Sequence, residues 1–414
     1  MSATILVHQL ENGLTLLAEP MEWLESAAFS LVSPAGYGWD PPDRLGLANL
    51  TCEMLQRGAG KRNSRQFVDD LERLGVDWSS SISHAHTNFG AAMLADNLET
   101  ALEFFADVVR RPHLPADQLE DARQVCLQEV RAVEDDLYTR VIQELRRRQY
   151  PDPYGRSRQG TRETLLAITM DDVREFFTRQ FQPAGTILSV AGKIDWPSLQ
   201  RKVEELFGDW TPHPLPEWEE SPPERGYEHI THPSSQTHIG IAFDSVPYSH
   251  PDYFRARAAV GALSDGMSSR FFTEVRENRG LSYAVWATNA STQKYGAVLC
   301  YAGTGADRAQ QTLDVMIGEL VKLRDGIYPD ELRRVQVRIK SGLVMQQESS
   351  PARAASNAGD WYYLGRVQTL DEVEKIIDSL TVDDVNEYLA AHAPKEFTIV
   401  TLGQEALKPP ALSK

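Results

Sequence analysis

The segment TMDDVREFFTRQFQPAGTILSVAG at residues 169–192 has a second copy near the end of the chain. Its opening returns as TVDDVNEYL at 381–389, and its closing run TILSVAG returns as FTIVTLG at 397–403, about 212 residues later. Each copy is typical of a helix with a Thr N-cap and Asp in its first turn, followed by a β-strand. Two matched elements in the same order, with similar spacing, indicate a duplicated domain.

Other segments extend the duplication. LPADQLEDARQVCLQEV at 114–130 has a counterpart in YPDELRRVQVRIKSGL at 328–343. Between the halves, six prolines interrupt residues 211–233, which favours an extended linker. We therefore predict one domain over 1–210, a linker over 211–233 and a homologous domain over 234–414.

Each half mixes strand-like and helix-like segments. The first begins with TILVHQLENGLTLLAEP, where Glu-Asn-Gly predicts a β-hairpin. Longer segments with helical periodicity follow. We predict an α+β fold in which each half is an antiparallel-rich sheet with helices on one side.

Charge and cysteine content narrow the function. The 414 residues carry a net charge of −17, which argues against nucleic acid and anionic membranes as partners. No signal peptide or membrane span is expected from the pattern. Cys52, Cys126 and Cys300 lack metal-type spacing and are expected to be buried free thiols, which favours the cytoplasm.

The stretch GLANLTCEML at 46–55 predicts a mostly apolar helix. Asn49 and Glu53 lie four residues apart and so share one face of that helix. Three interpretations stay open at this point: a functional site, the remnant of one, or the solvent edge of a core helix.

Four segments together resemble the pitrilysin/insulinase family of zinc peptidases, and the resemblance covers nearly the whole chain. LSDGMSSRFFTEVRENRGLSYAV at 263–285 is the longest and most specific match. The others are the Gly-rich segment containing the predicted helix at 33–60, SHAHTNFGAAM at 83–93 and YPDPYGRSRQG at 150–160. The resemblance implies two similar halves of the α+β type.

The family binds Zn²⁺ through His-x-x-Glu-His on a helix and a Glu about 76 residues downstream. The resemblance places Asn49 at the first His, Cys52 at the general base and Glu53 at the second His, while Glu129 matches the third ligand. We expect no metal to bind to this chain. Asn49, Glu53 and Glu129 either complete the hydrogen bonding of a vacated pocket or hold a hard cation weakly.

Arg276 and Tyr283 have the spacing of an Arg/Tyr pair that stabilises the oxyanion in active members. The alternative is that Arg276 pairs with Glu274 or Glu277 on a helix surface and that Tyr283 belongs to the core. The first interpretation predicts a non-catalytic subunit whose zinc-bearing homologous partner hydrolyses peptides. That type resembles the zinc-lacking chain of two-chain bacterial members and the alpha subunit of the mitochondrial processing peptidase.

Two other roles remain possible from the sequence: a structural scaffold, as in the family's core subunits of respiratory complexes, and a homodimer that binds peptides without a metal.

The segment at 83–93 resembles the family's substrate-binding edge strand, which nominates His86, Asn88 and Phe89 for substrate contacts; an ordinary amphipathic strand is the alternative. His84 and His86 lie two residues apart on a predicted alternating strand and would face the same way, which makes them a weaker metal candidate; a solvated pair is the alternative.

An arginine-rich region faces an acidic partner, binds the carboxylate end of a peptide, or is solvated and locally paired. It comprises Arg146, Arg147, Arg148, Arg156, Arg158 and Arg162.

Overall fold

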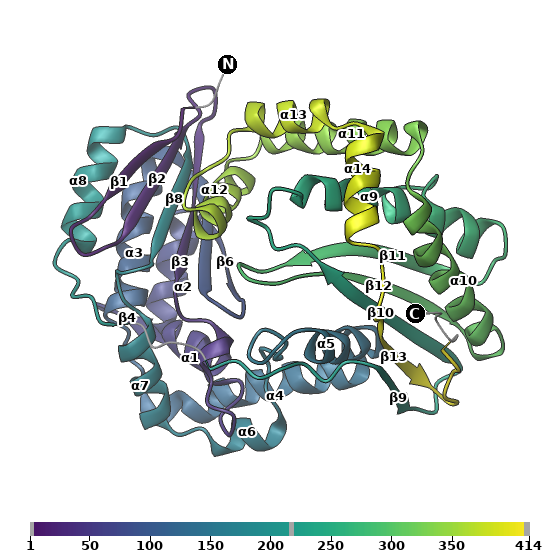
Figure 1. Ribbon diagram of the computed structural model, residues 1–414. Helices are drawn as coiled ribbons and strands as arrows, with labels where there is room; N and C mark the ends of the chain where they lie inside the picture. Colours follow the sequence, from purple (N-terminus) through teal and green to yellow (C-terminus); the bar gives the residue numbers. More distant parts are fainter. Residues whose placement is uncertain (1–3, 215–218, 410–414) are drawn as a thin grey trace. The chain divides into compact units, whose positions relative to one another are not determined.

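The computed structural model describes residues 4–214 and 219–409, and the chain forms two compact units (Figure 1). The first unit comprises residues up to Ala132, Arg156–Glu219 and Val344–Leu370. The second comprises Val133–Gly155, Glu220–Leu343 and the chain from Asp371 onward. Within the described ranges, no helix is both long and apolar enough to cross a membrane.

The first unit is built on a six-stranded sheet in the order β1-β2-β8-β3-β7-β6. The β2–β8 pair is parallel and the other pairs are antiparallel. The predicted hairpin at the start of the chain is confirmed as β1–β2. The strands are β1 (Leu6–Gln9), β2 (Thr15–Pro20), β3 (Ser26–Ser33), β6 (Asp77–Ile82), β7 (Thr87–Leu94) and β8 (Ile187–Gly192), with a separate short pair β4 (Gly58–Ala59) and β5 (Arg62–Asn63).

Helices cover both faces of this sheet. Figure 1 shows α3 and α8 on one side of the strands and α12 on the other. The main core lies under the first set and is centred on aromatic residues such as Phe29 and Phe105, whose rings are 5.2 Å apart. The helices are α1 (Leu47–Leu55), α2 (Ser64–Arg73), α3 (Leu98–Arg110), α4 (Leu119–Asp135), α6 (Arg162–Ala167), α7 (Met170–Gln180), α8 (Trp196–Phe207) and α12 (Ser350–Leu364).

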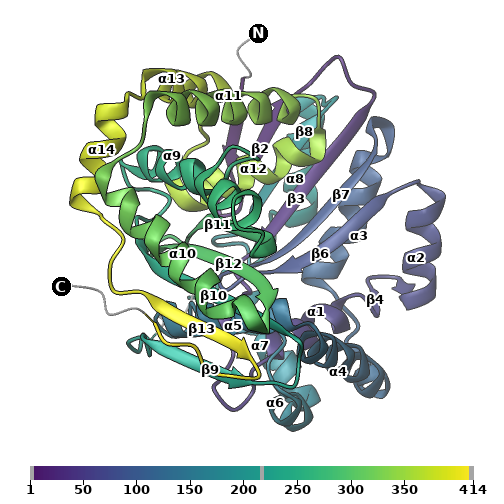
Figure 2. The same ribbon diagram turned by 90° about the vertical axis from the view of Figure 1, so that its right-hand side faces the viewer.

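The second unit holds a five-stranded sheet in the order β11-β12-β10-β13-β9, which Figure 2 shows in sequence across the sheet. The β13–β9 pair is parallel and the others are antiparallel. Its strands are β9 (Tyr227–Thr231), β10 (Gln236–Ser245), β11 (Ser282–Ser291), β12 (Gly296–Gly305) and β13 (Thr398–Gly403). Its helices are α5 (Leu137–Gln149), α9 (Tyr253–Ser264), α10 (Ala309–Lys322), α11 (Pro329–Gln346), α13 (Leu370–Ser379) and α14 (Val382–Ala391).

The two sheets repeat one topology. The order β2-β8-β3-β7-β6 in the first corresponds to β9-β13-β10-β12-β11 in the second, with the one parallel pair at the same place. The predicted N-caps are confirmed as well: Thr169 accepts a hydrogen bond from the Asp172 backbone N–H, and Thr381 accepts one from Asp384. The predicted α+β class of two sheets packed by helices is therefore correct.

Each unit also contains one helix from the opposite half of the sequence. The helix α12 packs across β3 and β8, and α5 packs on β10 and β13. The helix α12 is fixed by Arg353, whose Nε lies 2.9 Å from Oε2 of buried Glu19 on β2. The expectation of helices on one side of each sheet is therefore wrong, because β2, β3 and β8 are buried on both faces.

The last part of the predicted linker belongs to the second sheet. It forms β9, which pairs in parallel with β13. This part, residues 224–232, has no proline, and its Tyr227 hydroxyl lies 3.0 Å from Oγ1 of Thr401. Residues 215–218 of the linker lie outside the described residues.

Candidate functional site

The predicted apolar helix is confirmed as α1, and a buried carboxylate fixes its start. Asp40 accepts hydrogen bonds from the backbone N–H of Gly46 at 2.8 Å and of Ala48 at 2.9 Å. Burial raises the pKa of Asp40 to about 7, against the effect of these two N–H groups. Gly46 has a φ of +92°, and a Cβ there would meet the Gln159 carbonyl oxygen at 2.7 Å. The turn into α1 therefore requires glycine.

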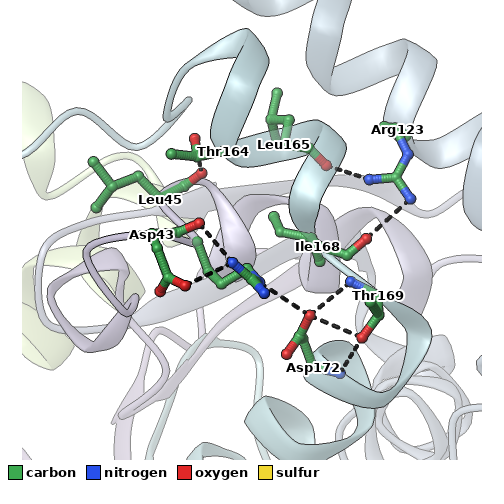
Figure 3. Close-up of polar contacts among 9 residues, drawn as sticks. Asp43, Leu45, Arg123, Thr164, Leu165, Ile168, Thr169 and Asp172 are labelled. Carbon is green, nitrogen blue, oxygen red and sulfur yellow. Dashed lines mark hydrogen bonds and ion pairs between the residues drawn. The ribbon is translucent and has the colours of Figure 1, made fainter.

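A set of hydrogen bonds fastens the segment before α1, and the helix α4, to α6 and α7 (Figure 3). Thr164 donates to the Leu45 carbonyl at 2.8 Å, and Arg44 contacts the Asp172 carboxylate at 3.3 Å. From α4, Arg123 donates to the carbonyls of Leu165 and Ile168. Because the segment before α1 and the helix α4 are both bonded to α6, the side chains of α1 and α4 meet in a defined geometry.

The side chains that meet are two of those that the resemblance aligns with the zinc motif. Asn49 is buried on α1, and its Nδ2 donates to Oε2 of Glu129 on α4 at 2.9 Å. The same nitrogen lies 3.6 Å from Sγ of Cys126, one helical turn before Glu129. The Asn49 amide thus donates a hydrogen bond to the carboxylate that the resemblance aligns with the third zinc ligand.

The other two positions that the resemblance aligns with the motif hold a thiol and a second carboxylate. Burial raises the pKa of the Cys52 thiol to about 12, so the thiol stays protonated at neutral pH and does not act as a general base. Burial, and then the charge of Glu129, raise the pKa of Glu53. Zn²⁺ prefers imidazole and thiolate ligands, so this donor set does not fit it. Across the described residues, no group of three or more His, Cys, Asp and Glu is arranged to hold a metal ion.

Sequence reasoning did not assign two neighbours of this pocket. Arg158 lies 4.0 Å from Oε2 of Glu129, and Arg156 donates to the Asp40 carbonyl at 2.6 Å. Both belong to the predicted arginine-rich region, whose members thus have partners inside the first unit. In the second unit, Arg147 and Arg148 pair with Glu144, Glu224 and Glu228, which favours local pairing.

Arg276 lies in a π-helical turn, η4 (Phe272–Glu277). A π-helical turn is rare and often marks a functional position. The Arg276 guanidinium stacks over the rings of Phe272 at 4.8 Å and Tyr283 at 4.4 Å. Among the described residues no carboxylate lies within ion-pair distance of it; Glu274 pairs with Arg279 instead.

Tyr283 is the extra residue of a β-bulge. The register shifts between Ser282, opposite Thr304, and Ala284, opposite Gly303, so that Tyr283 has no partner residue on β12. Its carbonyl accepts a hydrogen bond from Arg276 at 3.1 Å, and its side chain is 82% exposed. Bulges are frequent next to active sites because they redirect a side chain. Tyr283 is therefore not a core residue of its strand.

The residues nominated for substrate contact are placed differently from the expectation. The edge strand is β6, whereas Asn88 and Phe89 lie on β7, the second strand. Phe89 is fully buried in the core and is not available to a substrate, and the Asn88 side chain accepts a hydrogen bond from Ser30. His84 and His86 lie in the turn between β6 and β7, so their predicted alternation on one strand is wrong.

His86 packs edge-to-face on Tyr362, with ring centroids 5.1 Å apart. Burial lowers its pKa to about 4. His86 is therefore neutral at physiological pH and part of the packing between the β6–β7 turn and α12.

Two family profiles match the chain, one on each half. The profile of the insulinase family, peptidase family M16, matches residues 21–162, and that of the peptidase M16 inactive domain matches residues 167–339. Together they account for well over half of the chain.

Individual proteins match over nearly full length. A protein of Rickettsia felis named an uncharacterized zinc protease is 24% identical over 381 residues, 92% of each chain. A protein of Bacillus subtilis with a similar name is 26% identical over 380 residues, 91% of this chain and 92% of that one. The crystal structure of a peptidase M16 inactive domain from Pseudomonas fluorescens superposes with a TM-score of 0.87 at 22% identity, covering 98% and 99% of the two chains.

Proposed function

Because the chain belongs to the peptidase M16 (insulinase) family, we propose that it is the non-catalytic subunit of a two-chain zinc peptidase. In this role it supplies Arg276 and Tyr283 to peptide hydrolysis at a zinc ion held by a homologous partner. The proposal assigns no zinc ion to this chain, since the Asn49 amide donates to Glu129 and an amide is not a ligand that zinc prefers.

The observation that carries the proposal is the conformation of Arg276 and Tyr283. A π-helical turn and a β-bulge, both irregular, set one guanidinium and one phenol side by side at the surface. The guanidinium has no carboxylate partner among the described residues, and the Tyr283 side chain is 82% exposed. A scaffold has no need for either feature. A cation and an O–H donor held in advance are suited to stabilise an oxyanion in a transition state.

Arg276 and Tyr283 have different chemical roles in this proposal. The Arg276 guanidinium carries a fixed positive charge at any physiological pH, and its contact with the Tyr283 carbonyl limits its motion. The phenol of Tyr283 donates one hydrogen bond in a direction that the bulge sets. Neither group needs to transfer a proton, so both act by binding the substrate backbone and the developing negative charge.

Affinity purification of the tagged chain from its native cells, followed by mass spectrometry, tests the proposal. We expect a stoichiometric homologue with an intact His-x-x-Glu-His motif. Recovery of the chain alone, or with unrelated membrane subunits, would overturn the proposal and favour a homodimer or a structural scaffold.

A further inference from the structure

The β-bulge at Tyr283 is held by the hydroxyl group of the residue before it. Ser282 is 6% exposed, and its Oγ lies 2.7 Å from the carbonyl oxygen of Ala284 and 2.7 Å from that of Gly303. Ala284 and Gly303 are the paired residues directly after the bulge, on β11 and β12. The Ser282 hydroxyl therefore connects the strand before the bulge to the first pair that follows it.

A second hydroxyl group fixes the residue before Ser282. Thr304 lies opposite Ser282 on β12, and its Oγ1 donates to the Leu281 carbonyl at 2.6 Å. The Thr304 hydroxyl is itself oriented from the core, because fully buried Thr312 on α10 donates to it at 3.1 Å. The Leu281 N–H donates to the carbonyl of Val275 in η4 at 2.9 Å. Leu281 is thus bonded to β12 on one side and to the π-helical turn on the other.

Arg276 connects the same turn to the bulge. Its carbonyl accepts a hydrogen bond from the Gly280 N–H at 3.1 Å, and its guanidinium donates to the Tyr283 carbonyl at 3.1 Å. The Gly280 carbonyl accepts a hydrogen bond from Arg308 at 2.6 Å. The backbone between Arg276 and Tyr283 is therefore fixed by hydrogen bonds, to which the two hydroxyl groups contribute at the end that carries the phenol.

The bulge decides which way the Tyr283 side chain points. In a regular strand, side chains alternate between the two faces of the sheet. Tyr283 would then share a face with Val285, two residues later, which packs against the core of the second unit. The bulge interrupts this alternation, and the Tyr283 side chain is 82% exposed. Loss of a bond that holds the bulge should therefore turn the phenol away from solvent.

We propose that Ser282 and Thr304 are positioning residues for Tyr283, because their hydroxyl groups hold the bulge that presents the phenol. The inference rests on the proposed function where it concerns catalysis. Both hydroxyl groups lie against backbone carbonyls, so they act through Tyr283 and not on the substrate. One such hydrogen bond contributes a modest net stabilisation. Its removal should shift the conformation of the strand without unfolding the sheet.

The conformation is measured on the full-length chain alone, by NMR of isotope-labelled tyrosine. The Tyr283 signal is identified by its absence from Tyr283→Phe, and a soluble nitroxide should broaden it strongly because the ring is exposed. In Ser282→Ala, and in Thr304→Val, which removes the hydroxyl at nearly constant shape, the signal should shift and lose part of this broadening. Unchanged broadening in both variants would overturn the proposal.

Two control variants separate the hydroxyl groups from other effects of substitution. Thr304→Ser keeps the hydroxyl and should retain the wild-type signal and broadening. Thr398→Val removes a buried hydroxyl on β13 that donates to Gln149 at 2.7 Å, and β10 separates this strand from β12. It should leave the Tyr283 signal unchanged. Equal changes in Thr398→Val and Ser282→Ala would indicate a general response of the sheet and contradict the assignment.

A double-mutant cycle in the reconstituted two-chain peptidase tests whether Ser282 acts through the phenol. Ser282→Ala should lower kcat/KM by about twofold to tenfold, the equivalent of one hydrogen bond. In the Tyr283→Phe background the same change should cause no further loss, because the group that it positions is already absent. An equal loss in both backgrounds would show that Ser282 acts on the fold in general and would overturn its positioning role.

The positioning role and the proposed function fail separately. A Tyr283 conformation that depends on Ser282 and Thr304, in a chain that has no zinc-bearing partner, would support the positioning of Tyr283 and refute the proposed function. An active two-chain peptidase that requires Tyr283 but is indifferent to Ser282→Ala and Thr304→Val would do the reverse.

Discussion

The side-chain nitrogen of Asn49 lies 2.9 Å from a carboxylate oxygen of Glu129, a residue 80 positions further along the chain. The bond joins α1 to α4 between a buried amide and a partly buried carboxylate, and Arg158 contributes a second, longer contact to the same oxygen. The hydrogen bond joins two positions that the family resemblance aligns with zinc ligands.

Loss of the Asn49 amide should destabilise the first unit. Asn49→Ala removes a donor from a partly buried carboxylate, which costs about 1–3 kcal/mol in the free energy of unfolding. Urea denaturation of Asn49→Ala, Glu129→Ala and the double variant measures the coupling. A coupling energy of about 0.5–3 kcal/mol is expected, and a value indistinguishable from zero would show that the bond contributes no stability.

The pocket should accept zinc once its donors are restored. In Asn49→His/Cys52→Glu/Glu53→His, two imidazoles four residues apart face Glu129, which already lies within reach of position 49. We expect one zinc ion per chain by elemental analysis after dialysis, and none when Glu129→Gln is added. Equal zinc content in the triple variant and the wild type would mean that α1 and α4 no longer hold the ligand geometry.

Stability should decrease in mild acid because of His86. Burial lowers its pKa to about 4 in the folded chain, so the unfolded chain takes up the proton first. The contribution is complete above about pH 6.5 and is lost as pH falls toward 4, amounting to about 3 kcal/mol at most. His86→Phe keeps the ring contact with Tyr362 and removes the titration. The difference in unfolding free energy between wild type and His86→Phe should therefore change over this range; a constant difference would refute the assignment.

The anchor of α12 should be sensitive to the loss of one charge. Arg353 is 1% exposed and Glu19 is 4% exposed, and Asn357 hydrogen-bonds to both. Arg353→Met leaves a buried carboxylate without its cation, which costs about 3–5 kcal/mol. Adding Glu19→Gln should recover much of this loss in urea denaturation. If the single and double variants are equally unstable, the charge of Glu19 is not the cause.

Features with a local sequence signal were predictable. The duplicated capping boxes at Thr169 and Thr381 can be recognised from four consecutive residues each. The apolar periodicity of α1 places Asn49 on the side of the helix that contacts Glu129. Cys126 also carried a signal, because it lies one turn from Glu129 on the same face of α4.

Features that depend on distant partners were not predictable. The packing of α12 on the first sheet rests on Arg353 and Glu19, which are 334 residues apart. Phe89 lies on a strand whose alternation is clear, but only the pairing of β6 outside β7 decides that it is not at the edge. The bulge at Tyr283 has no local sequence signal, since it arises where β11 shifts register against β12.

The most direct test of the central claim is kcat/KM for peptide hydrolysis by the chain reconstituted with its co-purified zinc-bearing partner. Arg276→Ala should lower kcat/KM by about 10²–10³-fold, the typical cost of losing an oxyanion donor, while the two chains still associate. Arg279→Ala is the matched control, because that arginine follows the same π-helical turn and pairs with Glu274. An unchanged kcat/KM in Arg276→Ala, or an equal loss in Arg279→Ala, would contradict a role for Arg276 in catalysis.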